Sequence, residues 1–293
     1  MSDLANSLRA TPNVDQRELE RKTIISKERF GPWALITGAS SGIGREFARQ
    51  IAASGINVVL VARRETLLSE LGAECTKQFG VEYRVAALDL SQEGFVKQLS
   101  SVTNDLDIGL VISNAGTGKP GRFLTNDNQE MAKLLRLNTL AHLDIAYHFG
   151  RKLARRGRGG ILFVGAMGAD KGVPYMANDA GAKAYVQSFA EALHVEWKPL
   201  GLHVTVLPPG FTDTPVIEKF GFNRKNMPVK PMKVGQCVHE GLSALRDNRS
   251  LIIPGRVNRI MNAIIPARVV RSLQVSMFEK ILGGKAPAEM DEK

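Results

Sequence analysis

The 293-residue sequence has few of the residues that mark disulfide-bonded, metal-binding or nucleic-acid-binding proteins. Its two cysteines, Cys75 and Cys237, lie far apart without a partner motif, so neither a disulfide framework nor a thiolate metal site is predicted. The five histidines form no close pairs with carboxylates, and we expect no metal. Aromatic residues make up only 6%, and no recognition-helix or stacking motif accompanies the basic residues, which argues against nucleic-acid binding.

Long apolar runs are missing as well. No stretch of about 18 uncharged apolar residues is present to span a bilayer, and the first fifteen residues lack the apolar segment of a secretory signal. We therefore expect a cytoplasmic protein, either soluble or peripheral to a membrane. The 39 basic and 29 acidic residues give a net charge of +10, which suits an acidic partner, an anionic membrane surface or a phosphorylated cofactor, and equally an ordinary soluble surface.

Residues 34–44 (ALITGASSGIG) organise the chain, because an apolar strand pattern ends there in a glycine-rich turn and a helical pattern begins at once. Gly38 suits the tight turn, Gly42 lets the backbone approach a diphosphate, and Gly44 lets the helix pack close to the strand. The free N–H groups at the start of that helix favour an anion. A second apolar run at residues 56–62 follows one helix later, which completes a βαβ unit.

The rest of the chain continues the alternation of strand and helix patterns. Further strands are predicted at 81–88, 108–113, 161–165, 204–207 and 251–253. Seven strands with crossovers predict an α/β fold with a doubly wound parallel sheet. We expect one domain at residues 31–255, an N-terminal extension at 1–30 with a charged helix at 18–29, and a C-terminal extension at 256–293. The long irregular stretch at 210–233 is interpreted as a lid over a site.

Several motifs, in order, resemble those of the short-chain dehydrogenase/reductase family: TGASSGIG at 37–44, Asp89, SNAG at 113–116, Asn138, Lys183 and PPGFTDT at 208–214. The similarity covers residues 31–255, and the sequence that flanks these motifs is similar to that of the branch near long-chain ketoacyl and hydroxysteroid reductases. The resemblance implies a Rossmann-type fold and an oxidoreductase that works as a dimer or tetramer on a small-molecule substrate, free or linked to coenzyme A or a carrier protein.

By this resemblance, the dinucleotide contacts run from the diphosphate to the nicotinamide: Ser40, Ser41 and Ile43 in the glycine turn, Asp89 and Leu90 beside the adenine, Asn114, Ala115 and Gly116 at the adenosine ribose, Lys183 at the nicotinamide ribose, and Pro209, Gly210, Thr212 and Thr214 at the carboxamide. Arg63 and Arg64 follow the second strand, where arginine pairs with a 2′-phosphate. NADP(H) is therefore the predicted cofactor, although ordinary solvated arginines are the alternative.

The chain departs from the family where a tyrosine and a serine normally face the substrate carbonyl. Asp179 stands four residues before Lys183 in place of the tyrosine, and Ala166 stands in place of the serine, whereas Asn138 and Lys183 are kept. The positive field that lowers the pKa of a tyrosine would leave an aspartate ionised, unless strong burial reversed the effect. Asp179 is interpreted as a base, as a partner for a cationic substrate group, or as an ion-pair partner of Lys183.

Tyr175 is predicted to stand one helical turn before Asp179, either as a relocated proton donor or as a wall of the pocket. Residues 260–282 form an amphipathic basic stretch broken near Pro266. Its apolar face either covers the domain or a second subunit, or contacts anionic lipid or an acidic carrier protein.

Two classes of function follow from the departures. The first is an atypical NADP(H)-dependent oxidoreductase acting on a carbonyl, imine or conjugated substrate. The second keeps the fold without net hydride transfer, either as a cyclase, isomerase or dehydratase or as a cofactor-binding pseudoenzyme.

Overall fold

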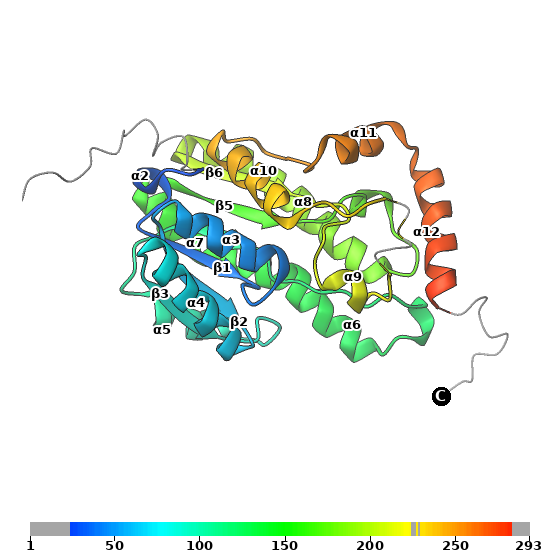
Figure 1. Cartoon of the computed structure of the whole chain (residues 1–293), viewed down its shortest axis with the longest axis horizontal. Helices are drawn as coiled ribbons and strands as arrows, with labels where there is room; N and C mark the ends of the chain where they lie inside the picture. The colour runs from blue at the N-terminus through cyan, green and yellow to red at the C-terminus, as the bar shows by residue number, and fades with distance from the viewer. Residues whose placement is uncertain (1–23, 224–226, 228, 283–293) are drawn as a thin grey trace, which may run out of the picture.

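The structure is a computed structural model that describes residues 24–223, 227 and 229–282, where helices cover both faces of a parallel β-sheet (Figure 1). The strands are β1 (Trp33–Thr37), β2 (Asn57–Ala62), β3 (Tyr83–Ala87), β4 (Ile108–Ser113), β5 (Gly159–Val164) and β6 (Leu202–Leu207). Their order is β3-β2-β1-β4-β5-β6, and every pairing is parallel. This confirms the predicted Rossmann-type α/β fold.

Long helices form the two outer layers. One layer contains α3 (Gly42–Ala53), α4 (Glu65–Phe79) and α10 (Val234–Arg246), and the other contains α5 (Phe95–Thr103), α7 (Ala141–Arg156) and α8 (Ala177–Trp197). The remaining helical segments are α2 (Lys27–Phe30), η1 (Phe123–Thr125), α6 (Asn128–Leu135), η2 (Arg136–Leu140), η3 (Ala169–Lys171), η4 (Lys198–Leu200), α9 (Val216–Lys219), α11 (Arg256–Ile264) and α12 (Ala267–Ile281).

The central strands are buried on both faces, which explains why their sequences are continuous apolar runs instead of alternating patterns. Every residue of β1, β4 and β5 is buried. Ala34 and Ile36 pack toward α3 and α10, whereas Leu35 packs into the opposite core. The strand order reverses between β1 and β4, and the carboxyl ends of strands at such a point are where open α/β sheets bind ligands.

The predicted seventh strand is wrong in extent. Leu251 forms a single bridge with Val206 of β6, through a hydrogen bond from Val206 N–H to the Ser250 carbonyl and one from Ile252 N–H to the Val206 carbonyl. Pro254 follows shortly after. Because proline has no N–H to continue a ladder, the pairing ends there.

The predictions for the two ends of the described chain had different outcomes. Of the helix predicted at 18–29, residues 18–23 lie outside the described residues, and the helix present is the short α2, whose Phe30 is buried against His203. The predicted break near Pro266 is confirmed, since α11 ends at Ile264 and α12 begins at Ala267. In Figure 1, α12 runs along the end of the molecule opposite α2.

Two glycine-to-alanine variants should change stability in opposite directions. A Cβ at Gly44 would lie 2.3 Å from the Gly38 carbonyl oxygen, so Gly44→Ala should destabilise the fold by about 1–3 kcal/mol. A Cβ at Gly181, exposed inside α8, meets nothing within 4 Å, so Gly181→Ala should stabilise it by about 0.5–1 kcal/mol. Urea unfolding measures both free energies, and equal midpoints for the two variants would contradict the packing argument.

Candidate active site

The glycine turn after β1 has no room for a side chain at Gly38. Gly38 has a φ of 68°, and a Cβ there would lie 2.7 Å from Asn114 Nδ2. Gly42 begins α3 with a φ of 56°. Ser41 precedes the helix and makes no side-chain cap hydrogen bond, so the first N–H groups of α3 face the turn without a side-chain acceptor from Ser41. This is the arrangement that binds a diphosphate.

Thr37 joins this turn to the end of β4, and the sequence analysis missed it. Its Oγ1 accepts hydrogen bonds from the backbone N–H groups of Asn114 and Ala115, both at 2.9 Å, and donates to the Ile112 carbonyl. The side chain of Asn114 donates back to the Thr37 carbonyl at 2.8 Å. The signal in the sequence is that Thr37 ends the strand and is the first residue of the TGASSGIG motif.

Arg64 lies over the glycine turn. Its Nη2 donates to Ser40 Oγ at 2.9 Å and to Ser41 Oγ at 3.3 Å. The guanidinium is exposed, so it can also face a ligand in the turn. Arg63 is exposed beside it, and its charge reaches Asp89.

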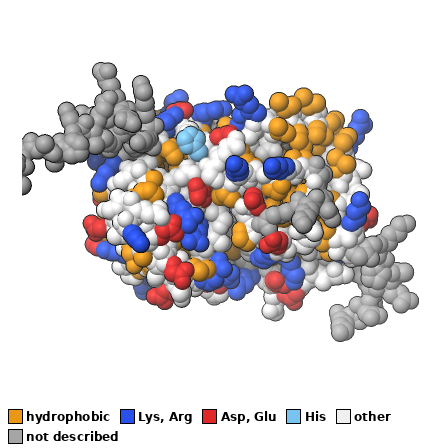
Figure 2. Space-filling model, in the orientation of Figure 1, with side chains coloured by type: hydrophobic (Ala, Val, Ile, Leu, Met, Phe, Trp, Pro, Cys, Tyr) orange, Lys and Arg blue, Asp and Glu red, His pale blue; other side chains and the backbone are white. Residues whose placement is uncertain are grey.

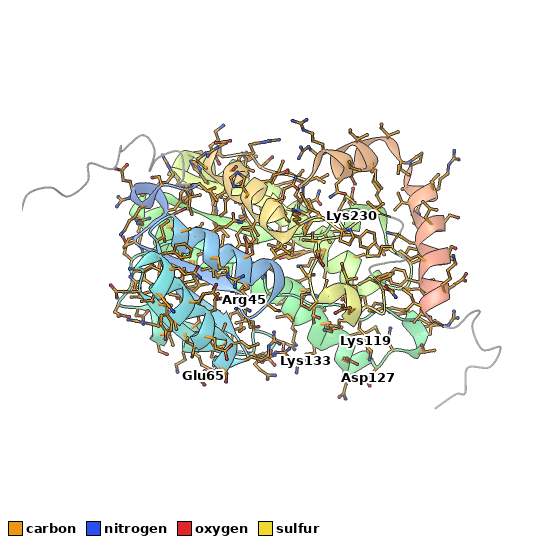
Figure 3. All side chains as sticks on the ribbon, in the orientation of Figure 1. Arg45, Glu65, Lys119, Asp127, Lys133 and Lys230 are labelled. Carbon is orange, nitrogen blue, oxygen red and sulfur yellow. The ribbon has the colours of Figure 1, made fainter. Side chains whose placement is uncertain are left out.

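Asp89 follows β3, and its Oδ1 accepts hydrogen bonds from the backbone N–H and hydroxyl of Ser91. Lys133, labelled in Figure 3, lies 3.6 Å from its Oδ2. Burial opposes ionisation of this carboxyl, but the Ser91 hydrogen bonds and the charges of Lys133 and Arg63 outweigh it and lower the pKa of Asp89. Leu90 beside it is buried, which suits an apolar contact with an adenine.

Lys183 reaches the same edge of the sheet from α8. Its Nζ donates to the Val164 carbonyl at 2.8 Å. A Cβ at Gly116 would lie 3.1 Å from that Nζ and 2.8 Å from Asn138 Oδ1, so only glycine fits between them. Burial lowers the pKa of Lys183 to about 8, and the nearby Asp179 partly offsets this effect. Lys183 is therefore poised to exchange a proton near neutral pH.

Asn138 lies in η2, a π-helical turn between α6 and α7. Its Nδ2 donates to the Thr117 carbonyl at 2.7 Å, and its Oδ1 accepts from the Thr117 N–H at 3.2 Å. Such π turns are rare and are found most often at functional sites. The sequence predicted a helix around Asn138 but gave no sign of the widened turn that directs its side chain toward Thr117.

Asp179 is buried at the start of α8. Its Oδ2 accepts a hydrogen bond from the Lys119 N–H at 3.1 Å, and its Oδ1 lies 3.5 Å from Asn138 Nδ2. In Figure 3, Lys119 lies between α6 and α9. Among the described residues no ion pair within 4.0 Å joins Asp179 to Lys183, which instead bonds Val164.

Burial has a larger effect on the pKa of Asp179 than the positive field has. Desolvation raises its pKa above the ordinary aspartate value, against the opposing effects of the Lys119 N–H and the charges of Lys183 and Lys219. From the sequence alone, the positive field was expected to keep Asp179 ionised unless strong burial reversed the effect. Met176, Phe220 and the Asp179 carboxylate gather at Gly118, where an added Cβ would lie within 3.0 Å of all three side chains.

Tyr175 precedes α8 instead of lying on it, so the prediction that it stands one helical turn before Asp179 is wrong. Its backbone has a φ of 63°, and its hydroxyl donates to Glu279 Oε1 at 3.2 Å. Its ring contacts Phe278 of α12 and the Arg122 guanidinium. Tyr175 is thereby held as a wall beside α12.

A cavity of about 660 Å³ opens next to Asp179 and Tyr175. Met131 and Leu134 of α6 and Val275 of α12 line its apolar walls, and Phe123 and Leu124 of η1 also line it. The cavity therefore joins a buried carboxyl group to a mostly apolar space. Asn178 faces the same region and donates to the Met131 carbonyl at 3.1 Å.

The segment after β6 closes the site from the other side. Met167 N–H donates to the Pro209 carbonyl, and Thr212 Oγ1 donates to the Gly210 carbonyl. Thr212 and Thr214 are buried, and a Cβ at Gly42 would lie 3.3 Å from Thr214. The structure thus brings residues 209–214 to the glycine turn. Ala166 carries only a methyl group near this segment.

These residues fit a dinucleotide. Gly38, Gly44 and Gly116 let the surrounding backbone and side chains pack closely around the turn, the open N-terminus of α3 suits a diphosphate, and Arg64 supplies a cation beside it. In the described residues no group of three or more His, Cys, Asp or Glu side chains gathers to hold a metal. Burial raises the pKa of Cys75 to about 11 and that of Cys237 to about 12, so both thiols are unreactive near neutral pH.

The family model for short chain dehydrogenases matches residues 32–224, which is more than half of the chain. The chain therefore belongs to the short-chain dehydrogenase family. This family assignment confirms the resemblance found in the sequence motifs.

Two curated relatives illustrate the range of the family. The chain is 30% identical over 242 residues to a 7beta-hydroxysteroid dehydrogenase of Collinsella aerofaciens, covering 80% of this chain and 89% of that protein. It is 36% identical over 188 residues to a very-long-chain 3-oxoacyl-CoA reductase of Meyerozyma guilliermondii, covering 60% of this chain and 55% of that protein. The chain thus spans about half the length of this reductase.

Solved structures agree with the fold. A 7beta-hydroxysteroid dehydrogenase studied for its stereoselectivity matches with a TM-score of 0.77 and 27% identity, over 85% of this chain and 98% of that one. A short-chain dehydrogenase from Sphingobium yanoikuyae in complex with NADPH matches with a TM-score of 0.72 and 26% identity, over 89% of this chain and 99% of that one.

The pH dependence of stability tests the state of Asp179. Its pKa is higher in the folded than in the unfolded chain, so folding binds protons between the two values and wild-type stability falls as pH rises through them. Asparagine does not ionise. We therefore expect the unfolding free energy of Asp179→Asn to gain on that of the wild type as pH rises above about 4, the ordinary aspartate pKa.

Urea unfolding across this pH range measures the difference, and Asp105→Asn is the control. The exposed Asp105 carboxyl has its pKa lowered by its hydrogen bond from Arg84, so its titration lies below about pH 4 and its replacement should give a difference that stays constant across this range. A pH-independent difference for Asp179→Asn would show that burial does not set the protonation of this carboxyl.

Proposed function

We propose that this chain is an NADP(H)-dependent oxidoreductase that acts on a carbonyl, imine or conjugated group without the family's usual serine and tyrosine. The observation that carries the proposal is the arrangement around Lys183, whose buried Nζ lies against Gly116 while Asp179, one turn earlier, faces the apolar cavity. When bound, the cofactor supplies or accepts a hydride. The residues of the chain orient the substrate and hold the proton that accompanies it.

The preference for NADP(H) rests on Arg64. It is held over the glycine turn by Ser40 and Ser41, and its guanidinium suits a 2′-phosphate better than a 2′-hydroxyl. Arg63 adds a second cation beside it. The NADPH complex of the Sphingobium yanoikuyae relative supports this choice.

The substrate class follows from the cavity. Its volume of about 660 Å³ and its apolar walls suit a bulky apolar molecule or an acyl chain. The names of two relatives, a hydroxysteroid dehydrogenase and a very-long-chain 3-oxoacyl-CoA reductase, point to the same class. Lys119 and Arg122 also line the cavity, which is compatible with an acyl group carried on coenzyme A or a carrier protein.

Asp179 replaces the tyrosine as the proton-holding group in this proposal. Burial raises its pKa, which favours the protonated acid, and burial lowers the pKa of Lys183 to about 8. A donor and an acceptor whose pKa values move toward neutrality are suited to general acid–base work. Ala166, with no hydroxyl, leaves the carbonyl oxygen to a single donor.

The same observation supports an alternative function. A buried carboxyl beside a lysine also suits proton removal without net hydride transfer, as in a cyclase, isomerase or dehydratase, and a cofactor-binding pseudoenzyme needs neither group. NADPH absorbance during turnover separates these functions. Product formed with loss of NADPH supports the oxidoreductase, and product formed at constant NADPH supports the alternative.

We also propose a cytoplasmic homo-oligomer. On the outer layer of α7 and α8, Tyr147 is 66% and Val195 is 70% exposed, and large exposed side chains of this kind suit a contact with a second copy.

Residues 216–219 lie over the site as part of the proposed lid, where Lys219 Nζ donates to Thr117 Oγ1. Within the described residues, no helix has the length and apolar content needed to cross a membrane.

Replacing Arg63 and Arg64 with alanine should weaken NADPH binding by about 1.5–3 kcal/mol, or roughly 10- to 150-fold, because a charge-assisted phosphate contact is lost. NADH binding should change little. Fluorescence titration with both cofactors measures the change, and Arg155→Ala, an exposed arginine on α7, is the matched control. Equal weakening for both cofactors would contradict the assignment.

Asp179→Asn should abolish the native reaction while leaving NADPH affinity nearly unchanged, because the amide keeps the shape but carries no exchangeable acid proton. The paired change Ala166→Ser with Asp179→Tyr should create or raise reduction of a simple ketone, by about 10² to 10⁴-fold. NADPH absorbance measures both. Full native activity in Asp179→Asn would rule out the carboxyl, and Tyr175→Phe would then test the neighbouring phenol.

A further inference from the structure

Helices α11 and α12 present an exposed surface that the reaction does not use. We define the C-terminal basic face by the exposed side chains of these two helices: Arg256, Val257, Ile260, Ile264, Arg268, Val269 and Leu273. Its aliphatic members are 62%, 58%, 72%, 42% and 63% exposed in chain order. Figure 2 shows a continuous hydrophobic area over α11 and the start of α12, with Lys and Arg side chains at its margin.

The spacing shows that this face is built on one side of each helix. Val257, Ile260 and Ile264 are three and four residues apart on α11, and Val269 and Leu273 are four apart on α12, so each set forms a stripe. None of the residues of α11 is buried. This helix is held at its margins instead, by an ion pair from Arg259 to Glu240 and by a hydrogen bond from Lys171 to the Asn262 carbonyl.

The charge around the stripes has one sign. Residues 256–282 contain five cationic side chains and a single carboxylate, Glu279, which accepts a hydrogen bond from Tyr175 beside the cavity. No carboxylate among the described residues lies within 4.0 Å of Arg256, Arg268 or Lys280. An anionic surface would therefore complement this face in charge as well as cover its aliphatic side chains.

We propose that the C-terminal basic face seats the protein on an anionic lipid surface. A second copy is less suited, since an isologous contact would bring the like charges of two such faces together. The exposed apolar side chains are valine, isoleucine and leucine, whereas protein-binding patches are enriched in aromatic residues. Aliphatic stripes with arginine margins are typical of helices that lie in a lipid interface.

The seating has a consequence for the cavity. α12 supplies Val275 to the cavity wall, and Phe123 and Leu124 of η1, 56% and 71% exposed, line the same cavity. A lipid surface against α12 therefore lies next to an apolar entrance. This consequence rests on the proposed substrate class, whereas lipid binding itself does not depend on turnover.

Flotation of the full chain with vesicles tests the proposal. The protein should float with vesicles of phosphatidylcholine containing phosphatidylserine and not with phosphatidylcholine alone, and added salt should release it. Arg256→Gln and Arg268→Gln should each reduce binding about fivefold, which corresponds to about 1 kcal/mol per charge near a lipid surface. Ile260→Ser with Ile264→Ser should reduce it about tenfold or more.

Val195→Ser on α8 and Arg155→Gln on α7 are matched controls, exposed elsewhere, and should bind as the wild type does. Thermal melting of each variant shows that the fold is kept. The proposal is overturned by equal flotation with both kinds of vesicle, by no flotation of the wild type, or by isoleucine variants that dissociate an oligomer while vesicle binding stays unchanged. Loss of reductase activity in any variant has no bearing on these outcomes.

Discussion

The hydrogen bonds of Thr37 hold together the two strand ends on which the rest of the site depends. Its Oγ1 accepts from the N–H groups of Asn114 and Ala115, so the end of β4 is fixed against the end of β1. The glycine turn follows one strand and residues 114–116 follow the other. One hydroxyl group thus ties the glycine turn to residues 114–116, and the closeness of Asn114 to Gly38 leaves no room for a side chain at position 38.

The side chains of Asn138 and Lys183 come together at Gly116. This glycine separates Asn138 from Lys183, and Lys183 is tied to the end of β5 through the Val164 carbonyl. Burial removes water from the Lys183 ammonium group. The charge of Asp179 offsets this loss only in part, so the pKa of Lys183 falls to about 8. The same burial raises the pKa of Asp179. A site that shifts both groups toward neutrality keeps an acid and a base available together.

The sequence could predict features whose causes are local. Glycine turns and strand–helix alternation follow from steric demands and hydrophobic periodicity within short segments, so the parallel sheet, apart from its seventh strand, and the glycine turn between β1 and α3 were predicted correctly. Features set by distant contacts were missed or wrong. Asp179 packs near Gly118 and Phe220, Tyr175 contacts Glu279 and Phe278 of α12, and the widened turn at Asn138 has no sequence signature.

The family match covers the candidate dinucleotide site and nearly all of the residues that line the cavity. The match ends at residue 224, and the candidate dinucleotide-binding residues lie within it. The cavity, however, is completed by α12, where Val275 lines the wall and Phe278 packs between Tyr175 and Phe222. Relatives that share the core but differ in this helix would keep the cofactor site and change the cavity. In the proposed function, α12 therefore modifies a substrate cavity whose other lining residues lie within the family match.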